Sequence, residues 1–445
     1  MKTIPLIAIA AAFPSLASAA PAPPRDLAYE IVEGLTTEVG QRLAGTEAEA
    51  RARDWGVVKL ISLGFSNVRI ETYEMPVWVR GTETAEIMSP YPQRLVLAAL
   101  GHSGATPESG LTANVIGFAT LAAFKAAPDA SVKGKIVYVS HQMRPTQDGS
   151  SYGAFGPVRF GGPNIAAKKG AAAFLIRSVG TDAHRNPHTG ITNWDKGVAP
   201  IPTAALSIPD ADNLERMLAR APAAVSLRLT LTPKFIGNRT SGNVIAEVPG
   251  SDPAAGMIIV GGHLDSWDLG TGAIDDAAGI AITTAAAKRL LDGPKPRRTV
   301  RVVWWGSEEV GGFGSDAYFD AHKGERHALA AESDFGADRV WRVDLKLPDA
   351  AKVLGDRLTA ALAPLGIAPG RQPAGGGADV EKLVGAGVAV VDLRQDGTRY
   401  FDLHHTPDDT LDKIDPAQLA QNVEAWSILI NLAANAPEDL MAGRK

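Results

Sequence analysis

Five separate segments in the second half of the chain carry histidines or carboxylates of the kind that bind divalent metal ions. They are Gly262-His263-Leu264-Asp265-Ser266, Gly272-Ala273-Ile274-Asp275-Asp276, Ser307-Glu308-Glu309, Glu332-Ser333-Asp334 and His404-His405-Thr406-Pro407-Asp408-Asp409-Thr410. Imidazole nitrogen and carboxylate oxygen suit zinc, and paired sites share a bridging carboxylate. Two such ions, about 3.5–4 Å apart, can hold one water molecule and polarise one carbonyl group. The segments supply the histidines and carboxylates for such a pair and a further carboxylate to shuttle a proton.

Each segment has a simpler explanation when it is taken alone. A single histidine after a strand is usually an ordinary polar residue, and an Asp-Asp pair before an apolar helix commonly caps that helix. A Glu-Glu pair after a strand usually lies in a solvated loop. The functional interpretation therefore rests on the combination, because functional loops gather at the carboxyl ends of parallel strands.

The apolar pattern around these segments predicts an α/β fold. Residues 257–260 and 299–304 are predicted buried strands, and 277–291 between them is a predicted helix. Strand, helix and strand in that order indicate a mainly parallel sheet flanked by helices. Residues 243–248 and 388–391 are predicted to add strands to the same sheet.

The first half of the chain has a different pattern of predicted helices, strands and loops. Helices are predicted over about 27–43 and 47–63, and strands over 68–73 and 95–100. From about residue 111 to 231, short β-rich runs alternate with Gly- and Pro-rich loops, which indicates an inserted β-rich domain.

Composition narrows the function classes. The net charge is −5 without a long basic run, which argues against nucleic acid as a partner. There is no cysteine, so disulfides, thiol nucleophiles and cysteine-bound zinc are excluded. Lys2, an apolar stretch over 4–13 and small residues up to Ala19 are typical of a secretory signal peptide cleaved near Ala19, so we expect a secreted or periplasmic protein. No later segment has the roughly 20 apolar residues of a membrane span.

The five segments resemble the M28 family of zinc peptidases. The resemblance covers nearly the whole mature chain and includes the stretches 76–81, 175–179 and 187–191. The inserted part resembles a protease-associated (PA) domain. The implied organisation is a signal peptide at 1–19, a first part of the peptidase domain at 20–110, a PA-like domain at 111–240 and the catalytic part at 241–445.

The resemblance implies a role for each site residue. His263 and Asp334 would bind one zinc ion, Glu309 and His405 a second, and Asp275 both. Asp265 would accept a hydrogen bond from the distal nitrogen of His263, which fixes the tautomer of that ring. Glu308 would be the general base that takes a proton from the bridging water and passes it to the leaving amine. The family also has a cis peptide bond after the bridging aspartate, here Asp275-Asp276.

Other polar residues are less clearly assigned by the sequence. Asp379, in Gly376-Gly377-Ala378-Asp379, is the one residue left to support the ligands where the wider family has Ser-Asp-His. His404 is expected to point away from its neighbour His405 if both lie on an extended segment. Tyr400 and Arg394 could bind substrate or be structural. His184 and His188 are interpreted as polar loop residues.

Alternative functions remain at this level. An M20-type zinc peptidase orders its ligands similarly, but its inserted domain falls between the ligand motifs. A receptor-like binding protein or a glutaminyl cyclase-type enzyme would share the fold, but such proteins generally lack ligands or the second metal. By resemblance, the substrates are short peptides, particularly dipeptides with a free amino terminus; aminopeptidase action on longer peptides is the alternative. A homodimer is also implied.

Overall fold

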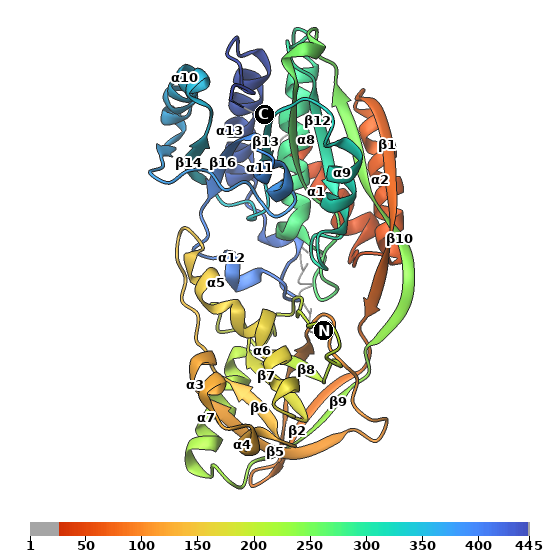
Figure 1. The fold of residues 1–445 in the computed structure, drawn as a ribbon, viewed down its shortest axis with the longest axis vertical. Coiled ribbons are helices and arrows are strands. Elements are labelled where there is room, and N and C mark those ends of the chain that lie inside the picture. Colours follow the sequence, from red (N-terminus) through yellow and green to blue (C-terminus); the bar gives the residue numbers. More distant parts are fainter. Residues whose placement is uncertain (1–25, 444–445) are drawn as a thin grey trace, which may run out of the picture.

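The computed structural model describes residues 26–443, which form two eight-stranded sheets at opposite ends of an elongated molecule (Figure 1). The predicted signal peptide at 1–19 lies outside the described residues. Within the described part, no helix is long and apolar enough to cross a bilayer.

The first sheet has the order β1-β10-β12-β11-β13-β16-β14-β15. Its strands are β1 (Ser66–Val79), β10 (Lys234–Val248), β11 (Met257–His263), β12 (Val300–Trp305), β13 (His327–Glu332), β14 (Val340–Lys346), β15 (Ala368–Pro369) and β16 (Ala389–Gln395). The central strands β12, β11, β13 and β16 are parallel. Strand β10 is antiparallel to β1 and β12, and β14 is antiparallel to β16 but parallel to β15. The predicted α/β class, with helices flanking a mainly parallel core, is confirmed.

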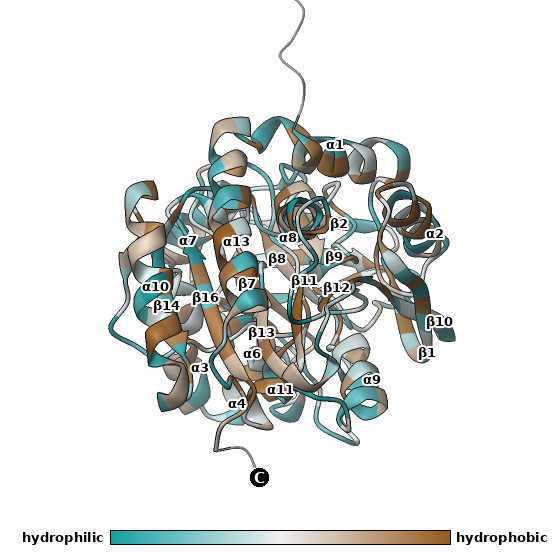
Figure 2. Ribbon diagram, turned by 90° about the horizontal axis from the view of Figure 1, so that it is seen from above, coloured by the Kyte–Doolittle hydropathy of each residue, from teal (hydrophilic) through white to brown (hydrophobic). Residues whose placement is uncertain are grey.

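Helices cover both faces of this sheet, and the sequence of β12 shows why. Val302 and Trp304 pack in one apolar cluster with α8 (Ala278–Leu291) and α13 (Pro416–Asn435). Val303 and Trp305 pack in another, with α9 (Phe313–His322) and α11 (Glu381–Gly385). Because alternate residues face opposite sides, a strand buried on both faces is apolar throughout. Figure 2 shows this as hydrophobic colour along the central strands.

The remaining helices of this domain are short or lie at its edges. They are α1 (Leu27–Gly34), α2 (Glu47–Ser62), α10 (Lys352–Leu362) and α12 (Tyr400–Leu403).

The second sheet has the order β3-β2-β9-β5-β6-β7-β8-β4. Its strands are β2 (Glu83–Ser89), β3 (Gln93–Leu95), β4 (Leu97–Ala99), β5 (Leu111–Phe118), β6 (Ile136–Val139), β7 (Ala173–Arg177), β8 (Thr203–Leu206) and β9 (Ser226–Leu231). The helices packed with them are α3 (Leu121–Ala126), α4 (Asp129–Val132), α5 (Ser150–Phe155), α6 (Pro157–Lys168) and α7 (Ile208–Arg220). This sheet begins at Glu83, whereas the sequence placed its start near residue 111, at the first residue of β5. The short strands β2 to β4 carry no local signal that tells which sheet they join.

The two sheets are connected by a long antiparallel ribbon. Strands β1 and β10 pair from Ser66 opposite Glu247 to Val79 opposite Lys234. The chain enters the second sheet after β1 and leaves it into β10, so both crossings lie side by side. Figure 1 shows this ribbon along one side of the molecule.

Arg42 ties the N-terminal segment to the loop that follows β11. The helix predicted over 27–43 is shorter: α1 passes into a π-helical turn over Leu35–Val39 and ends where Gly40 takes a φ of 81°. Arg42 is fully buried, and its guanidinium donates to the carbonyl oxygens of Leu264 at 2.6 Å, Thr271 at 2.6 Å and Gly272 at 2.8 Å. Gly272 itself has a φ of 62°, and a Cβ there would meet the Arg42 guanidinium at 2.8 Å.

We therefore expect Arg42→Met to lower the free energy of unfolding by more than about 3 kcal/mol, since each buried carbonyl left without a donor costs about 1–3 kcal/mol. The matched control is Arg289→Met, which removes an exposed pair with Glu424 and should cost less than about 1 kcal/mol. Urea unfolding monitored by circular dichroism measures both. Equal midpoints for the two variants would contradict the structural role of Arg42.

Candidate metal centre

The structure brings the predicted ligands together at the carboxyl ends of β11, β12 and β13. His263 is the last residue of β11, Glu309 follows β12, and Asp334 follows β13. Asp275 lies in the turn Ala273–Ala277 that leads into α8, and His405 comes after α12. Four loops and a strand end therefore converge on one point of the sheet edge.

Asp275 stands between the two histidines. Its Oδ1 lies 3.0 Å from Nε2 of His263, and its Oδ2 lies 3.2 Å from Nε2 of His405. Asp334 Oδ1 is 3.5 Å from the same nitrogen of His263, and Glu309 Oε2 is 2.9 Å from that of His405. The side chains thus form two groups, one with His263 and Asp334 and one with His405 and Glu309, which share Asp275.

The distal ring nitrogens of both histidines face main-chain carbonyl oxygens. His263 Nδ1 is 2.8 Å from the carbonyl of Asp265, and His405 Nδ1 is 3.2 Å from that of Thr189. A ring that donates from Nδ1 keeps the lone pair of Nε2 free, and Nε2 is the atom that faces the carboxylates. Both imidazoles are therefore held in the tautomer that a metal ion requires.

The main chain of Asp265 makes the contact to the distal nitrogen of His263. The acceptor is the carbonyl of Asp265, because the carboxylate Oδ1 lies 3.7 Å from His263 Nδ1. The carboxylate instead accepts hydrogen bonds from the backbone N–H groups of Glu308 at 3.1 Å and Glu309 at 3.3 Å. Asp265 therefore fixes the loop after β12.

Two further buried aspartates act on the backbone in the same way, and the sequence interpretation gave them no role. Asp276 accepts from the N–H groups of His263 and Gly279, each at 3.0 Å. Asp409 Oδ1 accepts from those of Ala273 and Ile274, each at 2.7 Å. The Asp275-Asp276 peptide bond is cis, as the family resemblance implied.

The donor atoms fit a divalent cation. Asp275 Oδ2 and Glu309 Oε1 are buried and have no hydrogen-bond donor within the described residues. Although burial favours the neutral acid, the neighbouring imidazoles of His263 and His405 hold the pKa of Asp275 well below its usual value. An ionised, enclosed carboxylate with an unused lone pair is costly unless a cation is bound. The imidazole and carboxylate set is the one that zinc takes.

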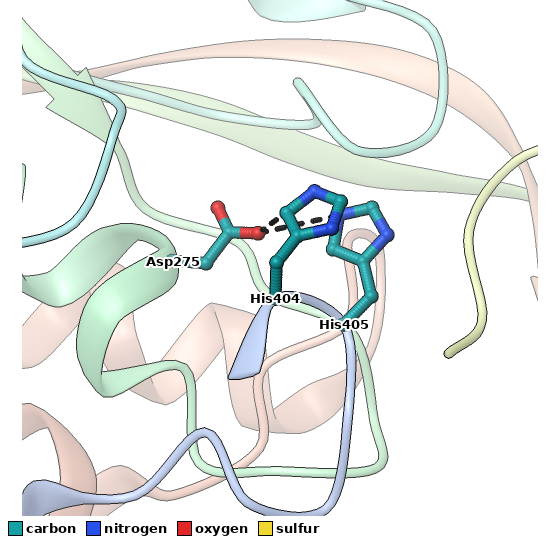
Figure 3. A group of neighbouring side chains, drawn as sticks. All are labelled: Asp275, His404 and His405. Carbon is teal, nitrogen blue, oxygen red and sulfur yellow. Dashed lines mark ion pairs between the residues drawn. The ribbon is translucent and has the colours of Figure 1, made fainter. Parts of the chain in front are cut away.

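His404 also faces the centre, contrary to the expectation that it would point away (Figure 3). Its ring stacks on that of His405 with centroids 3.5 Å apart, and its Nε2 lies 3.6 Å from Asp275 Oδ2. The reason is that His405 has a φ of 62°, so consecutive side chains do not alternate as on an extended strand. Burial and the neighbouring His405 lower the pKa of His404 well below its usual value.

The two loop histidines of the second domain have different environments. His184 is exposed and pairs with Asp408 at 2.9 Å. His188 is fully buried; its Nδ1 is 2.8 Å from the carbonyl oxygen of His404, and its Nε2 is 2.5 Å from Asp182. His188 therefore supports the backbone next to the metal centre.

A cavity of about 240 Å³ opens on the centre and has walls from both domains. Glu308 lines it together with Asp275, Glu309, Asp334 and His405 on one side. Helices α5 and α6 contribute Tyr152, Arg159 and Phe160 on the other side, and Tyr400 also lines it. A smaller cavity of about 130 Å³ lies next to it and shares Asp334 and Phe335; Arg394 lines this second cavity.

Asp379 is buried next to Glu332. Its N–H donates to Glu332 Oε2 at 3.0 Å, and neither of its carboxylate oxygens has a donor within the described residues. Burial, followed by the repulsion of Glu332, raises the pKa of Asp379 well above its usual value. It therefore contacts the metal loop through Glu332 and makes no direct contact with a histidine ligand.

We expect His263→Ala to lower the zinc content of the purified protein, because the variant loses the one imidazole of its group. The control is His322→Ala, which removes a histidine that pairs with Glu71 and Glu325 outside the centre. Inductively coupled plasma mass spectrometry after gel filtration measures zinc per chain. An unchanged zinc content in His263→Ala would remove that residue from the ligand set.

Comparisons with known proteins identify the family of this chain. The model of peptidase family M28 matches residues 243–430. Carboxypeptidase Q from Bos taurus is 35% identical over 416 residues, which cover 93% of this chain and 86% of that protein. The crystal structure of a peptidase M28 precursor from Shewanella amazonensis superimposes with a TM-score of 0.89 and 48% identity, covering 92% of this chain and 93% of that chain. A zinc aminopeptidase from Bacillus subtilis shares the fold, with a TM-score of 0.65 and 21% identity over 92% of this chain and 97% of its own. The chain therefore belongs to peptidase family M28 and is a zinc metallopeptidase.

Proposed function

We propose that this protein is an exported two-zinc peptidase that hydrolyses short peptides, particularly dipeptides with a free amino terminus, with Glu308 as general base. The observation that carries the proposal is the shared position of Asp275, whose two oxygens each face a different histidine.

The count of two ions is supported by the arrangement of the ligands. His263 and Asp334 would hold one zinc ion, Glu309 and His405 the other, and Asp275 would contact both. When bound, the zinc pair supplies Lewis-acid polarisation of the scissile carbonyl and lowers the pKa of a water molecule.

The adjacent residues Glu308 and Glu309 have different environments, which supports different roles. Glu309 contacts His405, whereas Glu308 lines the cavity and belongs to none of the side-chain groups that could hold a metal in the described residues. Burial and the nearby carboxylates of Asp334 and Glu309 raise the pKa of Glu308 well above its usual value. A carboxylate of raised pKa can take the proton of the attacking water and deliver it to the nitrogen of the leaving amine.

Short substrates are supported by the size and walls of the two cavities. The larger cavity, about 240 Å³, is below the range of roughly 300–1,000 Å³ for drug-sized ligands. The smaller one is lined by the carboxylates of Asp148, Glu332 and Asp392, and its single cationic residue, Arg394, already pairs with Asp392 at 2.6 Å. An ammonium group would be attracted there, next to Asp334. The names of the relatives, a carboxypeptidase and an aminopeptidase, also point to action at peptide ends.

Three other expectations belong to this proposal. The sequence of residues 1–19 supports export to a secreted or periplasmic location. The PA-like identity of the second domain and the homodimer rest on the family resemblance alone. N-terminal sequencing of the mature protein and analytical ultracentrifugation test the first and the last.

We expect Glu308→Gln to lose about 10²–10⁴-fold in kcat while zinc content is kept, because the amide cannot accept the proton of water. The control is Glu424→Gln, which changes an exposed glutamate paired with Arg289. Steady-state kinetics together with metal analysis measures the effect. Near-full activity of Glu308→Gln would assign the base elsewhere.

The substrate class is tested by comparing alanyl-leucine, its N-acetylated form and an unblocked tetrapeptide. We expect cleavage of the free dipeptide, loss on acetylation and little cleavage of the tetrapeptide. Activity should disappear after chelation and return with zinc. Efficient stepwise cleavage of the tetrapeptide from its amino end would instead establish an aminopeptidase of longer peptides.

A further inference from the structure

We propose that Arg159 binds the free α-carboxylate of the residue on the C-terminal side of the scissile bond, so that the enzyme requires one residue, and a free carboxyl end, after the bond that it cleaves. This inference rests on the proposed peptidase function and names the end of the substrate that is recognised.

Arg159 is a buried cation without an anionic partner. It lies in α6 with 2% of its surface exposed, and no carboxylate of the described residues is within 4.0 Å of it. The half-buried Arg80 and the buried Arg301, by contrast, pair with Asp268 and Glu247, each at 2.8 Å. Burying a charge without a counter-ion is costly, and a guanidinium cannot lose its proton to avoid that cost.

The hydrogen bonds of Arg159 are also incomplete. Two other buried arginines, Arg42 and Arg298, also have no carboxylate partner. Each donates to four main-chain carbonyls, which accounts for its burial by a structural role. Arg159 donates to the carbonyl of Thr189 and the hydroxyl of Tyr152, and its Nε is buried with no acceptor in the described residues. A guanidinium has five N–H donors, so an acceptor is missing.

The nearby histidine does not supply that acceptor. Nη1 of Arg159 lies 3.3 Å from Nδ1 of His405. With a cation on Nε2, the ring proton of His405 is on Nδ1, which faces the carbonyl of Thr189 at 3.2 Å. The guanidinium of Arg159 and the ring of His405 both donate to the carbonyl of Thr189. The contact between Arg159 and His405 therefore leaves the guanidinium charge uncompensated.

The position of Arg159 sets the length of the ligand. Its guanidinium lies against one nitrogen of the His405 ring, and the other nitrogen of that ring faces the reaction centre. A carboxylate on Arg159 would therefore be separated from the centre by little more than the width of an imidazole, which leaves room for a single residue. Phe160 and Tyr152, with rings 4.6 and 5.4 Å from the guanidinium carbon, and Ile191 would flank that residue's side chain.

The geometry favours a carboxylate over other anions. The planar guanidinium matches a carboxylate through two parallel N–H donors. The cavity is small and has aromatic walls, so the anion that Arg159 binds must lie only a few atoms from the scissile bond. In a short peptide, the α-carboxylate is the anionic group closest to that bond. A side-chain carboxylate of an acidic residue has the same chemistry, and the experiment separates the two.

The first test compares kcat/KM for alanyl-leucine, alanyl-leucinamide and alanyl-glutamic acid α-amide with the zinc-loaded protein. We expect the free acid to exceed both amides about 10- to 100-fold, the value of a charge-assisted hydrogen bond. In Arg159→Gln this ratio should approach one, and Arg159→Lys should recover part of it. Thermal unfolding and zinc content identify any variant that fails to fold.

The second test measures binding without turnover. Alanyl-leucine and its amide are titrated by calorimetry into zinc-loaded Glu308→Gln and into the double variant with Arg159→Gln. We expect tighter binding of the free acid only when Arg159 is present. The matched control, Arg394→Gln, changes the arginine of the neighbouring cavity.

The outcomes separate the inference from the function on which it rests. Equal cleavage of the acid and both amides overturns the role of Arg159 and leaves the peptidase intact. Preference for the side-chain carboxylate, or loss of discrimination in Arg394→Gln instead of Arg159→Gln, also overturns it. Absence of any cleavage contradicts the proposed function, and the calorimetric comparison still decides whether Arg159 binds the carboxylate.

Discussion

The carboxylate of Asp275 is the constraint on which the rest of the centre depends, because its two oxygens must face two histidines from different loops at once. Its Oδ1 contacts His263 at the end of β11, and its Oδ2 contacts His405 more than a hundred residues later. The side chain is almost fully buried, so it cannot rely on water for stabilisation. The backbone on both sides must therefore be rigid enough to hold three side chains within hydrogen-bond distance.

That rigidity comes from carboxylates that bind the backbone. Asp265, Asp276 and Asp409 each accept two main-chain N–H groups from segments that carry the ligands or the base or adjoin them. Main-chain donors stabilise the negative charge and add no flexible partner. Arg42 completes the arrangement by binding the carbonyls of the loop before Asp275. The acidic motifs thus contain two kinds of residue, those that face the metal and those that hold the loops.

Much of this organisation could be predicted from the sequence, for identifiable reasons. The strand β12 and the helix α8 lie within a residue of their predicted bounds, and β11 begins at the predicted residue but extends three residues further, to His263. Strands buried on both faces are apolar throughout, which makes them recognisable in the sequence. The positions of ligand motifs at strand ends follow from the parallel order. The direction of His404 could not be predicted, since it depends on the left-handed backbone of His405. The start of the second sheet could not be predicted either, because the pairing of β2 with β9 joins segments over 130 residues apart.

The second domain is part of the metal centre as well as a wall of the cavity. Its Thr189 both donates to the carbonyl of His405 at 3.0 Å and accepts from the ring of the same residue. His188 holds the carbonyl of His404, so the segment that carries a metal ligand is fixed from outside its own domain. Arg159, on the same domain, faces the cavity. The β1–β10 ribbon sets the position of the second domain. That position therefore determines the orientation of a metal ligand and the distance between the metal centre and Arg159, across which a substrate would bind. A change in the ribbon would alter metal binding and substrate length together, which explains why this domain cannot be treated as an independent module.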